Sequence, residues 1–142
     1  MRFRSSTGSF ELSIVADAPP AAPVRSAGSL YCQLSTAWRQ RVDHQLTPLR
    51  AWEVRRLLGG LRSLWNRAAR HVSLTFAQPE LSFDASVLPD LTYRLRIQVG
   101  DGLRPEGYPY PDFPLELDLV LNRTQLAEAI EDLSNQLVAC SE

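Results

Sequence analysis

Apolar and polar side chains alternate one by one in six separate stretches of the chain. In the last of them, Leu115, Leu117 and Leu119 alternate with Glu116 and Asp118. A period of two places successive side chains on opposite faces of a strand, so each stretch predicts a strand with one apolar and one polar face. Strands buried on both faces, as in parallel sheets, would read as continuous apolar runs instead. The six stretches are residues 10–14, 30–39, 71–76, 81–87, 92–99 and 115–121.

A segment with helical period follows the second stretch. The spacing predicts a helix over residues 48–65, with Thr47 as N-cap and Pro48 at the first helical position. Gly59 and Gly60 interrupt it, and each glycine costs about 1 kcal/mol relative to Ala in a helix. The apolar stripe stays in phase across them, so we expect one weakened or kinked helix, approached closely there by a neighbouring backbone. The stripe consists of Val54, Leu57, Leu58, Leu61, Leu64 and Trp65.

A second helical stripe closes the chain, from Asn122 to about residue 139. Asn122 with Gln125 three residues later resembles a capping box, which satisfies two free N–H groups at a helix start. The stripe consists of Leu126, Ile130, Leu133 and Leu137.

Together these elements predict an α+β fold in the order β-β-α-β-β-β-β-α. We expect a single, mostly antiparallel sheet of about six strands with the two helices on one face. Gln78-Pro79 and Pro89-Asp90 are turn signals, so the third to fifth strands should form a meander. There are no internal sequence repeats. The length of 142 residues fits one domain, residues 1–142, with loops at 16–29 and 100–114.

Composition excludes several classes of function. The net charge of -1 implies no bulk attraction to nucleic acid or to an anionic membrane. Nothing approaches 18 continuous apolar residues, so no membrane span is expected and the cytoplasm is the default location. Cys32 and Cys140 lie far apart and only two histidines exist, too few ligands for a structural zinc. We expect no cofactor, with Cys32 a reduced thiol in the core and Cys140 one in a frayed terminus.

No arrangement of residues predicts catalysis. Nucleophile, metalloprotease, Walker and dinucleotide motifs are all absent from the sequence. His71 falls at an outward strand position, and His44 falls in a polar stretch read as a loop. Glu116 and Asp118 share the polar face of their strand, where ion pairs with the arginines of the neighbouring strand are a plainer account than acid–base chemistry. We therefore expect a protein that is not an enzyme.

Charge is unevenly distributed along the chain. Residues 39–70 hold eight arginines against two acids, whereas residues 101–132 hold eight acids against two arginines. The plain interpretation is a solvated face on each helix; the functional one is a charged surface for a partner. In the loop 100–114, aromatic residues either bind a partner or fold back over a sheet edge. The candidate partner-binding residues are Asp101, Arg104, Glu106, Tyr108, Tyr110, Asp112, Phe113, Glu128, Glu131 and Asp132.

Four segments resemble the WapI-type immunity proteins of bacterial polymorphic toxin systems. They are LTPLRAWEVRRLLGGLRSL, VSLTFAQPELSFDASV, LTYRLRIQV with the loop after it, and LELDLVLNRTQLAEAIEDLSNQL. The piece LTFAQPELSF is similar to the strand–EPNL–strand hairpin of that family. The resemblance covers about residues 30–138, and residues 16–29 replace the acidic, Trp-containing segment that the family usually has before its second strand. The family has no catalytic residues, so the resemblance implies a protein that occludes a cognate toxin.

Three hypotheses remain at this stage. The first is an immunity-type protein that binds and neutralises a cognate bacterial toxin, as a monomer or weak homodimer. The second is a structural or assembly subunit that pairs through exposed sheet edges. The third is an enzyme or small-ligand module on the outer sheet face, although a flat, wet surface is a poor ligand pocket. We expect neither a nucleic-acid nor a membrane partner.

Overall fold

The computed structural model describes residues 1–4, 8–15, 29–38, 41–76, 81–100 and 115–140. In these residues eight strands and two helices follow one another as four strands, a helix, four strands and a helix. The first half contains β1 (Arg2–Arg4), β2 (Gly8–Ile14), β3 (Ser29–Trp38), β4 (Arg41–Arg50) and α1 (Ala51–Trp65). The second half contains β5 (His71–Phe76), β6 (Leu81–Val87), β7 (Tyr93–Val99), β8 (Leu115–Leu121) and α2 (Arg123–Cys140).

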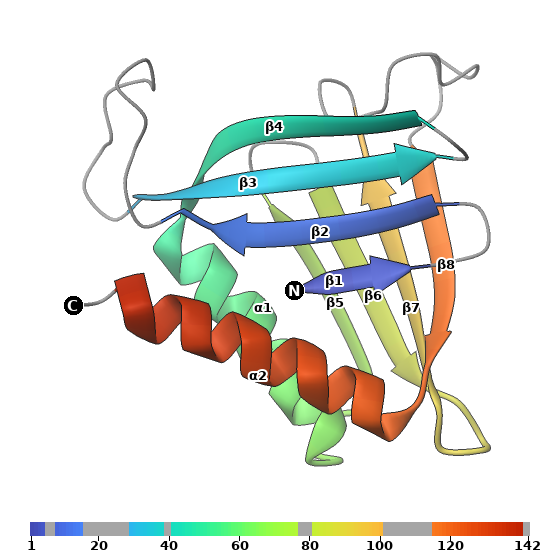
Figure 1. Ribbon diagram of the computed structural model, residues 1–142. Coiled ribbons are helices and arrows are strands. Elements are labelled where there is room, and N and C mark those ends of the chain that lie inside the picture. The colour runs from blue at the N-terminus through green and yellow to red at the C-terminus, as the bar shows by residue number, and fades with distance from the viewer. Residues whose placement is uncertain (5–7, 16–28, 39–40, 77–80, 101–114, 141–142) are drawn as a thin grey trace.

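The strands form two four-stranded antiparallel sheets, β1-β2-β3-β4 and β5-β6-β7-β8, and not the single sheet that we predicted. The strands of the two sheets run crosswise in Figure 1. Alternation shows that each strand has one apolar face, but two sheets that face each other have the same pattern as one sheet covered by helices. The α+β class, the antiparallel pairing and the meander of β5, β6 and β7 are confirmed.

The six predicted strands are all present, and the two that we missed are β1 and β4. β4 is an edge strand, where a proline is tolerated because it need not donate a ladder hydrogen bond. Pro48 lies in this strand opposite Tyr31, and Thr47 and His44 also belong to it. The predicted helix start at Thr47 and Pro48, and the loop at His44, are therefore wrong. Arg50 is the N-cap of α1 instead, with an extended backbone and no side-chain cap.

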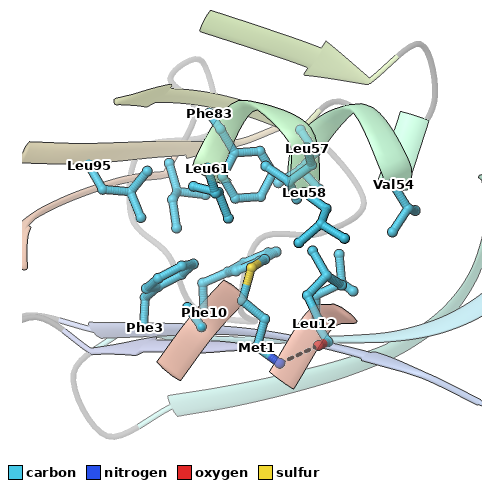
Figure 2. Close-up of a cluster of buried hydrophobic side chains, with 14 of the residues drawn as sticks. Met1, Phe3, Phe10, Leu12, Val54, Leu57, Leu58, Leu61, Phe83 and Leu95 are labelled. Atoms are coloured by element: carbon cyan, nitrogen blue, oxygen red, sulfur yellow. Dashed lines mark hydrogen bonds between the residues drawn. The ribbon is translucent and has the colours of Figure 1, made fainter. Parts of the chain in front are cut away.

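One apolar core fills the space between the sheets and under the helices. Figure 2 shows Phe10 of β2 and Phe83 of β6 meeting in this core, with ring centroids 5.6 Å apart in an edge-to-face contact. Leu57 and Leu61 of α1 lie against the same cluster. Cys32 is fully buried in β3, as predicted. The two sheets thus share the apolar faces that alternation predicted for each strand.

The helix pair contacts both sheets. α1 packs on β4, β5 and α2, and α2 packs on β2 and β8 (Figure 1). α1 runs without a break across Gly59 and Gly60. A Cβ on Gly60 would stand only 2.8 Å from Cγ1 of Val72 in β5, whereas one on Gly59 would meet nothing within 4 Å. The close approach that we expected is therefore made at Gly60, by a side chain and not by backbone.

The outer face of the second sheet is polar and carries cross-strand ion pairs, as predicted. The guanidinium of Arg94 donates two hydrogen bonds to Asp118, at 3.1 and 2.6 Å. Arg96 lies 3.7 Å from Asp118 and 3.9 Å from Glu116. Hydrogen bonding by Arg94 holds the pKa of Asp118 below its usual value. These carboxylates neutralise their neighbours on β7 and form no reactive pair.

Candidate partner-binding surface

The structure describes three of the ten predicted partner-binding residues: Glu128, Glu131 and Asp132 of α2. All three are exposed on the outer side of that helix. The other seven stay predictions, because they lie outside the described residues. These are Asp101, Arg104, Glu106, Tyr108, Tyr110, Asp112 and Phe113.

Asp132 is engaged within the fold. Its carboxylate accepts a short hydrogen bond from the Met1 ammonium group and one of 3.1 Å from the side-chain amide of Gln136. The hydrogen bond from the ammonium group lowers the pKa of Asp132 below its usual value. The Met1 nitrogen also donates to the carbonyl of Leu12, at 3.0 Å, so Asp132 fastens α2 to the first sheet. Asp132 therefore helps to hold the fold together, and its role in binding a partner stays a prediction.

Glu128 and Glu131 lie on different flanks of α2. Glu128 lines a hollow beside Arg2 and Arg4 of β1, whereas Glu131 lines a groove between α1 and α2. Neither carboxylate forms a hydrogen bond or ion pair with any residue in the described part of the chain. Both are therefore available to a cationic partner.

The groove between the helices combines an apolar floor with polar rims. Trp65 of α1 and Ile130 of α2 lie in it, and Arg62 donates a hydrogen bond of 2.9 Å to the hydroxyl of Ser134 across it. The buried Nε1 of Trp65 finds no acceptor among the described residues. The groove encloses about 410 Å³.

Two of the arginines of α1, Arg56 and Arg62, form contacts within the protein. Arg56 lies over the ring of Trp52, 5.3 Å from its centroid, and donates to the carbonyl of Thr75 at 3.0 Å. Trp52 itself is 52% exposed, which is unusual for so large an apolar ring. This stack and the helix groove give the outer face of α1 and α2 the mixture of aromatic, Arg and acidic groups that favours protein recognition.

The described residues offer little for chemistry. His71 is exposed, as predicted, and its Nε2 lies 3.0 Å from Oδ1 of Asp84. This pair faces solvent, and although Ser86 is the cross-strand neighbour of His71, no hydroxyl or thiol among the described residues forms a hydrogen bond with the His71 ring. In the described ranges, no group of three or more His, Cys, Asp or Glu side chains is placed to hold a metal ion.

Sequence reasoning missed a cluster of three arginines at the end of α1 and the start of α2. Arg67, Arg70 and Arg123 line a single hollow, although Arg123 is more than fifty positions from the others. An uneven charge distribution along the chain was visible in the sequence, but two of these arginines belong to the basic segment and one to the acidic segment. Only the packing of α1 against α2 brings them together.

The described residues form a small α+β protein of two four-stranded antiparallel sheets and two helices. A family model for the WapI-like immunity proteins matches residues 2–140, and the chain belongs to that family. The resemblance found in the sequence is thereby confirmed, over a longer range than we had assigned. No curated protein matches the chain.

The fold also occurs outside the family. The crystal structure of WHY1 from Arabidopsis thaliana is similar, with a TM-score of 0.51 and 11% sequence identity. The similarity covers 99% of this chain and 88% of that one. At this identity it shows a shared arrangement of strands and helices and nothing further. No helix in the described ranges is long and apolar enough to cross a membrane.

Proposed function

We propose that this protein is a non-catalytic immunity protein that binds and neutralises a cognate bacterial toxin in the cytoplasm of the producing cell. Membership of the WapI-like immunity family carries the proposal. The outer face of α1 and α2 supports it, because it combines an exposed tryptophan, an apolar groove and carboxylates that have no ion pair within the described residues. Occlusion of a toxin needs such a surface and no reacting group.

The acidic groups of α2 suit a basic partner. Glu128 and Glu131 are exposed and have no cationic partner in the described part of the chain. Complementary charge mainly raises the association rate and disfavours wrong partners. Its effect on the affinity of the correct complex is smaller. We expect the complex to form more slowly at high salt, because screening shortens the reach of these charges.

Co-expression with the toxin encoded next to this protein tests the proposal. Growth rescue and a complex that elutes as one peak on a sizing column are the expected results. If neighbouring toxins kill in the presence of this protein and no complex forms, the proposal is wrong. The identity of the adjacent gene is the first observation to make.

Variants identify the contributing surface. Glu128→Gln with Glu131→Gln should lower the association rate about tenfold, because long-range attraction changes rates by one to three powers of ten. The matched control is Asp84→Asn with Glu116→Gln, which removes two negative charges from the outer face of the second sheet. Equal effects of the two pairs would show that α2 is not the contact surface.

A further inference from the structure

Three arginines without an acidic partner among the described residues surround a hollow at one end of the molecule. The hollow lies between the end of α1, the turn from β6 to β7 and the start of α2, and it encloses about 600 Å³. Arg67 and Arg70 form no ion pair with a residue that the structure describes, and no acidic residue in those ranges lines the hollow. The remaining lining residues are Ala69, Val87, Leu88, Pro89, Leu91, Tyr93 and Arg123.

Arg123 is held in place by neutral groups. Its guanidinium lies over the ring of Trp65, 4.1 Å from the centroid, and donates a hydrogen bond of 3.1 Å to the hydroxyl of Tyr93. Stacking and a neutral acceptor fix the orientation of the side chain and leave its charge uncompensated. A ligand therefore meets a guanidinium that has already lost most of its freedom.

The backbone at Arg67 places an arginine where helices usually have glycine. α1 ends with the hydrogen bonds of a Schellman motif, from the N–H of Ala68 to the carbonyl of Ser63 and from that of Arg67 to Leu64, at 2.9 and 3.1 Å. The motif needs a left-handed residue at Arg67, whose φ is 62°. Glycine fits there without strain, so the arginine costs backbone energy.

The turn at Leu91 has the same character. Its N–H donates to the carbonyl of Leu88, and the N–H of Leu88 donates to the carbonyl of Thr92, at 2.9 and 2.8 Å. This is a three-residue hairpin loop whose last residue is left-handed, a place that favours glycine. Leu91 has a φ of 66° and is 60% exposed. Two left-handed positions thus carry a charged and an apolar side chain, and both line one hollow.

Strained backbone tends to persist where the side chain it presents is needed. We propose that this hollow is a docking site for an acidic segment of a protein partner, with carboxylates bound by Arg67, Arg70 and Arg123 and an apolar side chain packed beside Leu91. Arg–carboxylate pairs are strong and directional. The apolar wall, and a lining in which the described residues include no exposed aromatic ring, favour a peptide over a nucleic-acid strand, which would stack on such rings.

The inference rests on the proposed function in taking the partner to be a protein. The hollow adjoins the helix groove, because Trp65 lines the groove and also supports Arg123. A partner lying along this face would meet the carboxylate of Glu131 in the groove and the arginine cluster in the hollow. Opposite charges a fixed distance apart set the orientation of such a partner.

Fluorescence anisotropy with a short labelled peptide of Glu and Leu residues tests the site directly. We expect the full chain to bind this peptide and not its Gln-for-Glu counterpart. Arg67→Gly with Arg70→Gln should weaken binding about tenfold, as expected for two lost Arg–carboxylate contacts. The matched control, Arg50→Gln with Arg55→Gln, removes two exposed arginines elsewhere and should leave binding unchanged.

Thermal unfolding separates a functional role from a structural one. Leu91→Gly should raise the unfolding midpoint by about 3 °C, because glycine relieves the left-handed strain, and should weaken peptide binding. Arg67→Gly should gain less, because it also removes a cation near the end of α1, where the helix dipole favours one. A fall in the midpoint for Leu91→Gly would show that the leucine stabilises the fold, and would overturn its assignment to the site.

The remaining outcomes decide between the proposals. Equal binding of both peptides, or undiminished binding by the Arg67→Gly, Arg70→Gln variant, would overturn the docking site. Tighter binding of oligothymidylate than of the acidic peptide, measured at the same salt concentration, would also overturn the docking site. If the peptide fails to bind while co-expression still rescues growth, the docking site is wrong and the immunity function stands. If the peptide binds but no neighbouring toxin is neutralised, the docking site stands and the immunity function is wrong.

Discussion

Asn122 and Gln125 satisfy each other's backbone at the start of α2. The N–H of Asn122 donates to Oε1 of Gln125, and the N–H of Gln125 donates to Oδ1 of Asn122, both at 2.8 Å. This reciprocal pair is the capping box that the sequence predicted.

The cap at Asn122 should be measurable in the stability of the whole protein. Asn122→Ala should lower the free energy of unfolding by about 1 kcal/mol. The N–H of Gln125 loses its side-chain acceptor, and the reciprocal hydrogen bond from the N–H of residue 122 to Gln125 is no longer held in place. Urea unfolding monitored by circular dichroism measures the change. Asn135→Ala, at an exposed position within α2, is the control and should be neutral or slightly stabilising. Equal losses at both positions would contradict a role for the cap.

The adjacent glycines of α1 should respond in opposite directions to alanine. Gly59→Ala should raise the free energy of unfolding by about 0.5–1 kcal/mol, because its Cβ meets nothing and helix propensity improves. Gly60→Ala should lower it by about 1 kcal/mol, because its Cβ would stand 2.8 Å from the stiff side chain of Val72. Chemical denaturation of both variants measures these changes. An increase in the free energy of unfolding at both sites would show that Val72 of β5 moves aside at little cost.

Phe10 and Phe83 join the two sheets and should be energetically coupled. Either residue replaced by Ala should cost about 3–5 kcal/mol, as expected for a large aromatic ring in a core. A double-mutant cycle should leave a coupling of about 1 kcal/mol for the edge-to-face contact itself. Because such losses approach the total stability of many domains, Leu is the milder replacement if either Ala variant fails to fold. Strict additivity would contradict direct contact between the sheets at this point.

Asp118 should titrate below its usual pKa for as long as Arg94 is present. A carboxylate whose pKa is lowered on folding stabilises the protein above its unfolded pKa, and this contribution is lost as the pH falls through the folded pKa. NMR of the carboxyl carbon should therefore find a higher pKa for Asp118 in Arg94→Gln than in the unmodified protein. The variant should also lose less free energy of unfolding than the unmodified protein when the pH falls below about 4. Arg55→Gln serves as control. An unmoved pKa in Arg94→Gln would mean that the pair does not persist in solution.

The sequence predicted strands better than it predicted how they assemble. Six strands and the capping box followed from local patterns, because side-chain periodicity and cap chemistry are properties of neighbouring residues. Whether the strands form one sheet or two depends on contacts such as that between Phe10 and Phe83, which lie far apart in the chain. β4 escaped notice because an edge strand tolerates Pro48 and polar residues, which resemble a helix start.

The candidate surface was predictable only in part. Acidic residues on the outer side of α2 followed from helical periodicity, and Glu128 and Glu131 are exposed as expected. The structural role of Asp132 was not visible, because its partner Met1 is at the opposite end of the sequence. The arginine hollow was hidden for a related reason. Positive φ at Arg67 and Leu91 reflects turn geometry, and the residue types alone gave no sign of it.

The same succession of four strands and a helix occurs twice, and the two halves are interlocked. α1 belongs to the first half but also packs on β5 of the second, and α2 belongs to the second half but also packs on β2 of the first (Figure 1). Each half thus covers apolar surface that the other would expose. A break between Trp65 and His71 should therefore yield fragments that are aggregation-prone when produced singly and that reassemble when mixed. Such a protein can be built as a split sensor, in which recovery of the complete fold reports that the two pieces have met.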